Sequence, residues 1–194
     1  MVDSNILSAT SQSILLNTVS NIIAQLISIS RTSHGGQSIF SVFDYGLFIR
    51  FVIFSLISTP VNCIWQEKLE NTFPAPAGQE KQKKGETATE IEQNRRKLVV
   101  NTALKFLADQ SIGAALNTIL YVGVMEYLKM LGGGTTSAQV LDKIGQGFYP
   151  MLLAGYKFWP FVSLANFILV PVDQRVMVGG AAGFVWGVYL GLMG

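Results

Sequence analysis

Charge is concentrated in one short part of this chain, and the rest consists largely of apolar stretches. Residues 66–97 hold seven of the 14 Lys and Arg residues and six of the 12 Asp and Glu residues. Charged residues make up 13% of the whole chain, about half of the share usual in soluble domains. A soluble fold needs charge spread over its surface, so this distribution indicates a protein with several membrane-spanning segments.

The apolar stretches predict four or five membrane helices, because a helix needs about 20 mostly apolar residues to cross the hydrocarbon layer. They cover residues 13–30, 45–65, 111–128, 148–172 and 177–194. Pro160 and Pro171 enclose only part of the fourth stretch, so it is either a kinked span starting near Phe148 or a short helix followed by a turn. The expected fold class is all-α, a membrane helix bundle with short amphipathic surface helices.

The chain is expected to form a single membrane-embedded domain over residues 1–194. Within it, the charged segment 66–97 is interpreted as a hydrophilic loop leading into an amphipathic helix. Its Lys and Arg residues place the loop on the cytosolic side, or on the matrix side in a mitochondrion. Three glycines, 132–134, should end the third span, and a surface helix should follow them.

Amide side chains interrupt the apolar stretches. Asn17, Asn21 and Gln25 recur every four residues and so form one stripe on the first helix, while Asn117 and Asn166 lie in the third and fourth stretches. An unpaired amide in hydrocarbon is costly, so these groups should face protein or water. Two interpretations stay open: hydrogen bonds between helices, and the wall of a water-filled lumen.

Ionisable residues lie at or near the ends of the spans. They are Asp44, Arg50, Asp109, Glu126 and Arg175. One interpretation pairs Asp44 or Asp109 with Arg50, and Asp173 or Asp109 with Arg175. In the other, Asp109 and Glu126 favour cations at a lumen where Arg50 acts as a gate or an anion filter.

Glycine recurs every four residues in the last stretch, at Gly179, Gly183, Gly187 and Gly191. Without a side chain at these positions, a second backbone can approach closely, as in membrane helix pairs. The stripe predicts helix packing, either within the chain or between the subunits of a homo-oligomer.

Little in the sequence supports catalysis. His34 is the only histidine and Cys63 the only cysteine, so we expect no metal site. The hydrolase, zinc-protease and nucleotide-binding motifs are absent from the sequence, so we expect no cofactor and no enzymatic activity. A net charge of +2 does not indicate nucleic-acid binding.

Several short motifs resemble one family, that of the 22-kilodalton peroxisomal membrane protein, which also includes an inner-mitochondrial-membrane protein linked to mitochondrial DNA maintenance. Asp44, Arg50 and the Asp109–Gln110 pair fit its pattern in the first half of the chain. The other positions that carry the resemblance are Pro60, Trp65, Tyr149, Pro150, Trp159, Pro160, Asn166, Phe167, Val170, Pro171, Arg175, Trp186, Tyr189 and Leu190.

The resemblance implies a bundle of about four helices in a peroxisomal or mitochondrial inner membrane. It implies a channel or pore for small solutes or ions with a role in organelle homeostasis, or alternatively a non-conducting membrane organiser or sorting factor. Beyond the lipid bilayer, a solute or ion is the expected partner of a channel. The chain departs from the family pattern at Asn21, Thr59, Gln66, Ala115, Ser163 and Gly191.

Overall fold

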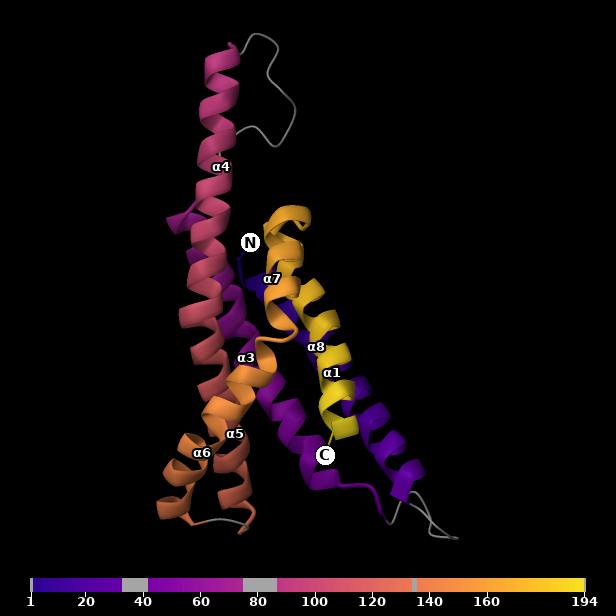
Figure 1. The fold of residues 1–194 in the computed structure, drawn as a ribbon. Helices are drawn as coiled ribbons and strands as arrows, with labels where there is room; N and C mark the ends of the chain where they lie inside the picture. The colour runs from indigo at the N-terminus through magenta and orange to yellow at the C-terminus, as the bar shows by residue number, and fades with distance from the viewer. Residues whose placement is uncertain (1, 33–41, 75–86, 134–135, 194) are drawn as a thin grey trace.

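The computed structural model describes residues 2–32, 42–74, 87–133 and 136–193. Of these described residues 92% are helical and none lies in a strand, which confirms the all-α fold class. In chain order, the elements are α1 (Val2–Thr32), α3 (Tyr45–Thr72), α4 (Ala88–Ala108), η1 (Asp109–Gly113), α5 (Ala114–Leu131), α6 (Ser137–Gly155), α7 (Trp159–Leu169), η2 (Val172–Gln174) and α8 (Arg175–Met193) (Figure 1).

Three helical segments are long and apolar enough to cross a membrane: Thr10–Ser30, Tyr45–Thr72 and Ala88–Leu131. A fourth results if α6 and α7, which meet at an angle of 56°, are counted as one broken span. For the fourth apolar stretch, the sequence left two alternatives open: a kinked span starting near Phe148, or a short helix between Pro160 and Pro171 followed by a turn. In the structure α7 is a short helix of 11 residues that begins at Trp159–Pro160 and ends before Pro171.

The charged segment is less loop-like than its composition indicated. Helix α3 continues to Thr72 and α4 begins at Ala88, so helices occupy both ends of the predicted loop 66–97. Leu69 is buried in the last turns of α3, and Glu70 there contacts Lys105 of α4 at 2.5 Å. These contacts extend α3 beyond its apolar stretch. Residues 75–86, in the middle of the predicted loop, lie outside the described residues.

The helix ends follow local sequence signals. Thr87 caps α4, since its hydroxyl accepts the N–H of Glu90 while the Glu90 carboxylate accepts the N–H of Thr87. Helix α5 ends at Leu131, and Gly133 follows in the left-handed conformation with φ +78°. The predicted surface helix after the glycines is the first half of α6, which continues without a break to Gly155.

The helices form two packed groups. Helix α1 packs against α8 and α3, and α5 packs against α6, while α3 also contacts α5. Figure 1 shows α1 and α8 side by side, with the α4–α5 column on the other side of the molecule. Helix α7 joins the groups because it contacts both α4 and α8. The group of α1, α3 and α8 therefore meets the group of α4, α5 and α6 in the middle of the bundle.

One irregular turn lies in the long α4–α5 column. Residues Asp109–Gly113 form a π-helix, η1, between two α-helical segments. Such wide turns often occur at functional sites because they alter which side chains a helix presents to its neighbours. Here Asp109 and Gln110, which are adjacent in sequence, both line the interior of the bundle.

Candidate functional site: a polar cavity inside the bundle

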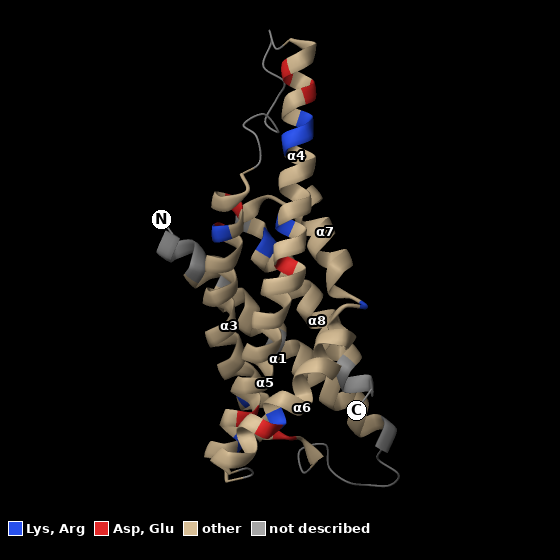
Figure 2. Cartoon of the chain, turned by 60° about the vertical axis from the view of Figure 1, so that its left-hand side comes forward, with Lys and Arg blue, Asp and Glu red and all other residues tan. Residues whose placement is uncertain are grey.

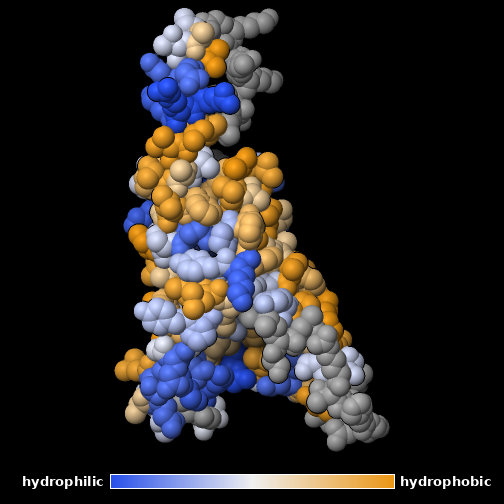
Figure 3. Space-filling view, in the orientation of Figure 1, coloured by the Kyte–Doolittle hydropathy of each residue, from blue (hydrophilic) through white to orange (hydrophobic). Residues whose placement is uncertain are grey.

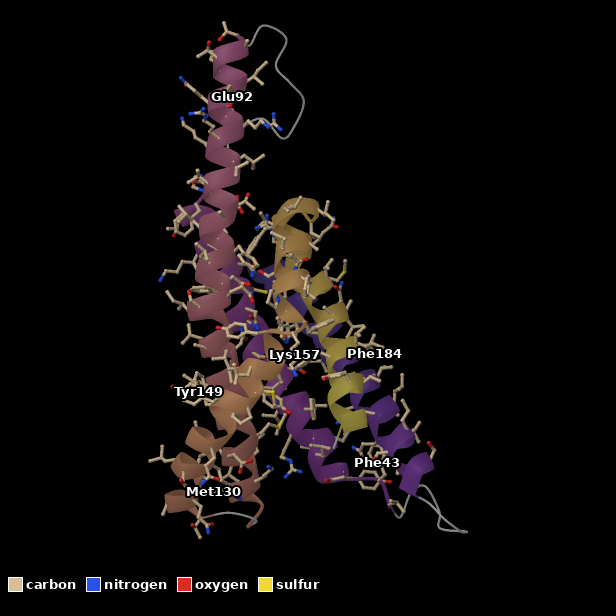
Figure 4. The ribbon with its side chains drawn as sticks, viewed as in Figure 1. Phe43, Glu92, Met130, Tyr149, Lys157 and Phe184 are labelled. Atoms are coloured by element: carbon tan, nitrogen blue, oxygen red, sulfur yellow. The ribbon has the colours of Figure 1, made fainter. Side chains whose placement is uncertain are left out.

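A cavity of about 290 Å³ lies where the two helix groups meet. Its wall comes from α1, α3, η1, α5, α6, α7 and α8, whose side chains are drawn in Figure 4. The wall is mostly apolar, with polar residues among the apolar side chains. The polar residues are Ser13, Ser58, Thr59, Asn62, Gln66, Asp109, Gln110, Asn117, Thr118, Ser163, Asn166 and Arg175.

The Asp109 side chain accepts three hydrogen bonds in the wall. Its Oδ1 accepts a hydrogen bond from Trp65 Nε1 at 3.0 Å, and its Oδ2 accepts one from Ser163 Oγ at 2.6 Å. Gln110 Nε2 also donates to Oδ2, at 3.1 Å. This one carboxylate therefore links α3, η1 and α7. Gly113 leaves room for the link, since a Cβ there would lie 2.8 Å from Trp65 Nε1.

A reciprocal amide pair forms another part of the wall. Asn62 Nδ2 donates to Asn117 Oδ1, and Asn117 Nδ2 donates to Asn62 Oδ1, both at 3.1 Å. Across the cavity, the Tyr156 hydroxyl donates to the backbone carbonyl of Gln110 at 2.8 Å. These bonds join α3 to α5 and the C-terminal end of α6 to η1, so they fix the spacing of the helices around the cavity.

A charged cluster adjoins the cavity and joins three helices. Glu70 Oε2 of α3 accepts from Lys105 Nζ of α4 at 2.5 Å and from Arg175 Nη1 of α8 at 2.9 Å. The Lys105 and Arg175 side chains are only 4% and 6% exposed, so these charges are removed from solvent. The sequence-based pairing of Arg175 with Asp109 or Asp173 missed Glu70, which lies in the segment expected to be a loop.

Arg175 also fixes the end of α7. Its Nε donates to the Val170 carbonyl at 3.1 Å, and its guanidinium lies 5.1 Å from the centre of the Phe167 ring. Asn166 Nδ2 donates to the Arg175 carbonyl at 3.3 Å. Asn166 is thus a tie between α7 and α8 as well as a cavity residue.

Two amides of the first helix, Asn21 and Gln25, lie away from the cavity. Gln25 Nε2 donates to Asn21 Oδ1 at 2.9 Å and to the Asp44 carbonyl at 3.0 Å, and Gln25 Oε1 accepts the Asp44 N–H at 2.7 Å. Both amides are buried, and neither lines the cavity. The geometry favours the interpretation of Asn21 and Gln25 as ties between α1 and the start of α3. The Asn17 side chain lies outside the described part.

The remaining ionisable residues form pairs nearer the helix ends. Arg50 Nη2 lies 3.7 Å from Asp44 Oδ2, which agrees with one of the two pairings expected for it. Glu126 bridges to Lys129 at 2.5 Å and to Lys143 at 3.7 Å, so it joins α5 to α6. Neither Arg50 nor Glu126 lines the cavity.

Gly180 and Gly187 of α8 face α1 closely, and both also line the cavity. A Cβ on Gly187 would lie 2.5 Å from Ser20 Oγ, which itself donates to the Phe184 carbonyl at 2.9 Å, so α1 packs closely here. Gly180, outside the predicted stripe, also faces α1. Gly179 and Gly183 line the cavity, and Gly191 lies outside the residues whose surroundings are described. The structure thus uses part of the stripe for packing within the chain.

Sequence reasoning overlooked the polar side of α3. Ser58, Asn62 and Gln66 recur every four residues and all line the cavity. The same spacing that identified a stripe on α1 would have identified this one. Glu70 and Lys105 were also missed, because nothing local shows that residues 35 positions apart meet.

Asp109→Asn is expected to destabilise the folded protein by about 1–3 kcal/mol, because an amide cannot accept at both positions that a carboxylate serves. The NH₂ group of the new asparagine would face at least one of the three groups that donate to Asp109, which belong to Trp65, Ser163 and Gln110. Thermal unfolding in detergent micelles measures the loss. Asp142→Asn, at an exposed residue of α6, is the matched control and should be near neutral. Equal stability of the two variants would refute the linking role of Asp109.

The fold and the site together define the class: a multi-pass membrane protein, an α-helical bundle around a partly open cavity that has polar groups in its wall. Comparison with known proteins supplies the family. Residues 130–191 match the sequence model of the Mpv17 / PMP22 family. The resemblance drawn from the sequence motifs is confirmed.

Relatives extend the likeness beyond these residues. The chain is 29% identical over 150 residues to "PXMP2/4 family protein 3" of Dictyostelium discoideum, covering 77% of this chain and 68% of the relative. It is 24% identical over 144 residues to "Protein sym1" of Schizosaccharomyces pombe, covering 74% of this chain and 58% of the relative. It is 27% identical over 89 residues to "Mitochondrial inner membrane protein Mpv17" of Drosophila melanogaster, covering 46% and 51%.

Except for the Dictyostelium protein, the chain spans about half the length of these relatives. No solved structure matches it significantly. The relatives are proteins of the mitochondrial inner membrane or the peroxisomal membrane, so the predicted location in an organelle membrane is confirmed.

Several of the residues that carry the resemblance lie at the cavity. Gln110, Trp159, Phe167 and Trp186 line it, and Trp65 bonds Asp109 in its wall. The ring centres of Trp159 and Trp186 lie 6.3 Å apart in an edge-to-face arrangement. Both residues are half-buried and line the cavity, although Trp residues of such spans are commonly interfacial anchors. Three positions that depart from the family pattern, Thr59, Gln66 and Ser163, also line the cavity.

Proposed function

We propose that this protein is a channel that passes small solutes across an organelle membrane by way of its central cavity. The observation that carries the proposal is the cavity of about 290 Å³, with amide, hydroxyl and carboxylate groups in its wall, inside a bundle of membrane helices. Polar groups inside a membrane protein commonly mark a solute or ion pathway, because they are costly in lipid.

The charged ends of the α4–α5 column support a position of the cavity near the middle of the membrane. Lys97 and Lys129 are 32 residues apart, about 48 Å along a helix, which is close to the ~40–45 Å of a bilayer with its headgroups. Figure 2 shows charges toward both ends of the column and a smaller group at mid-height, and Figure 3 shows much apolar surface, together with a hydrophilic patch, between the hydrophilic ends. Asp109 lies between these ends, about 18 Å from Lys97 along the axis.

Transporters commonly bind their substrates near the midplane, where broken helices meet. Here the break between α6 and α7 and the π-helical turn η1 both border the cavity: Tyr156 of the break bonds the Gln110 carbonyl of η1. This arrangement supports a pathway that passes between α6, α7 and η1.

Reconstitution into liposomes tests the proposal. Protein-containing vesicles should show solute flux or single-channel conductance that protein-free vesicles lack. Asn117→Leu, which removes a polar group from the wall, should lower that flux severalfold, whereas Asn101→Leu should leave it unchanged because Asn101 bonds the Pro74 carbonyl outside the cavity. A protein that is folded and inserted but passes neither solutes nor ions would favour the non-conducting organiser instead.

A further inference from the structure

The two ends of the cavity are closed to different degrees. We call the side of the membrane where α3 ends and α4 begins the loop side, and the side where α5 ends and α6 begins the turn side. Toward the loop side, α7 packs against α4, η1 and α8, so helices surround the cavity. Toward the turn side, α6 packs against α5 and makes no comparable contact with α1 or α8 within the described residues. The ring of helices is therefore incomplete between α6 and α8.

The cavity reaches this gap. Phe51 of α3, Tyr121 of α5 and Met151 of α6 form the turn-side end of its wall. Trp186 of α8 meets Trp159 at the start of α7, with ring centres 6.3 Å apart, and α6 and α8 separate from this contact toward the turn side (Figure 1). Figure 3 shows the molecule hollowed at its lower end, between the α5–α6 pair and the α1–α8 pair. The partly open cavity thus has its mouth on the turn side.

A cluster of charges covers the loop-side end of the cavity. The wall ends there at Gln66 on α3, at Asp109 on η1 and at Arg175 on α8. Glu70 and Lys105 each lie one helical turn beyond the wall, and the Glu70 carboxylate pairs with Lys105 at 2.5 Å and with Arg175 at 2.9 Å. The Lys105 and Arg175 side chains are only 4% and 6% exposed, so this layer admits little water. The three side chains in contact leave no room for a solute to pass.

One carboxylate in this cluster keeps three helices together. Lys105 belongs to α4 and Arg175 to α8, and their positive charges repel one another unless Glu70 of α3 lies between them. Loss of the contacts to Glu70 therefore drives α4 and α8 apart. A buried ion pair adds little net stability compared with apolar packing, and a switch is among the best-attested uses of such groups.

We propose that the cluster of Glu70, Lys105 and Arg175 is the loop-side gate of the pathway, and that the protein in this structure is open to the turn side only. A solute enters the cavity from the turn side and passes to the loop side when the ion pairs separate and α8 moves away from α3 and α4. Opening of a central site to one side at a time is a general mechanism of membrane transporters. This inference rests on the proposed channel function and names the element that regulates it.

Thiol labelling locates the opening. In a chain that carries Cys63→Ser, Gly179→Cys places a thiol on the cavity side of the gate, one turn from Arg175, where an added Cβ meets no atom within 4 Å. Two exposed positions report the two sides of the membrane: Gln93→Cys in α4 for the loop side and Ala138→Cys in α6 for the turn side. The full chain is reconstituted into vesicles in which one orientation predominates, and a membrane-impermeant maleimide is added outside.

We expect Gly179→Cys to be labelled to the same fraction as Ala138→Cys. Labelling to the fraction of Gln93→Cys would place the opening on the loop side and overturn the inference, as would complete labelling or none. Labelling does not depend on solute passage. The expected labelling in vesicles that pass neither KCl nor urea would therefore overturn the proposed channel function and leave the one-sided opening standing.

Lys105→Met tests the gate itself. It removes one of the two ion pairs and keeps the pair of Glu70 and Arg175, so the protein should still fold, which circular dichroism verifies. With the closed state weakened by one charge-assisted hydrogen bond, the flux of KCl and urea should rise about fivefold. Gly179→Cys combined with Lys105→Met should then be labelled from both sides.

Lys68→Met, at an exposed lysine of α3, is the matched control and should behave as the unmodified chain does. A purely structural role of the cluster predicts the opposite sign, because a loosened bundle that has no gate loses flux. Unchanged or lower flux in folded Lys105→Met, with labelling still confined to the turn side, would overturn the gate, as would an equal rise in the control.

Discussion

Glu70→Gln is expected to destabilise the folded protein by about 3–5 kcal/mol, the usual cost of removing one partner from a buried ion pair. The substitution leaves Lys105 and Arg175 without the carboxylate to which both donate, at 2.5 and 2.9 Å. Their side chains are almost wholly buried, so water cannot replace the lost charge. Thermal or denaturant unfolding in detergent micelles measures the loss.

Two further variants make this result specific to the cluster. Glu67→Gln changes an exposed glutamate one turn earlier in α3 and should be near neutral. Lys105→Met should cost less than Glu70→Gln, because the pair of Glu70 and Arg175 stays intact in it. If Lys105→Met were the more damaging of the two, the cluster would not be organised around Glu70.

Gly187→Leu is expected to separate α1 from α8 and to destabilise the protein by about 1–3 kcal/mol or more, as overpacked cores do. Even the first atom of the new side chain would lie 2.5 Å from Ser20 Oγ. Ser20 is buried and donates to the Phe184 carbonyl, so it cannot move aside without losing that bond. The loss is measured as a lower unfolding temperature.

Gly179 provides the comparison within the same helix. A Cβ there meets no atom within 4 Å, so Gly179→Ala should be neutral or slightly stabilising, because alanine favours the helix by about 1 kcal/mol. Gly187→Ala should fall between this variant and Gly187→Leu. A flat series, with all three variants equally stable, would contradict the close contact of α1 and α8 at this position.

The cluster around Glu70 shows how much of the site the sequence could predict. The sequence identified Arg175 and Asp109 as ionisable residues that need partners, because apolar surroundings make an isolated charge costly. It did not identify Glu70 as the partner, since Glu70 lies among the charges of a segment whose composition is typical of a loop. Helix α3 extends into the start of that segment, as far as Thr72, where Leu69 is buried and Glu70 contacts α4, and such contacts leave no local signal.

The amides give a second example. Their presence on apolar helices predicted that they face protein or water, and the described ones are buried or half-buried. Spacing alone could not assign them to a lumen or to a helix contact. Gln25 bonds the backbone of Asp44, whereas Asn117 and Asn166 line the cavity. The rotation of each helix about its own axis decides this, and that rotation is set by packing against the neighbouring helices.

Apolar length and the placement of charge are properties of the chain, and they determined by themselves that this protein is an all-α bundle of membrane helices. The family motifs, too, are readable in the sequence. The cavity was decided only by the tertiary structure, because it exists where α3, η1, α7 and α8 fail to fill the space between them. Polar groups separated by up to about a hundred residues meet there, as Glu70 and Arg175 do beside it. Their meeting depends on how the helices pack, which no local pattern encodes.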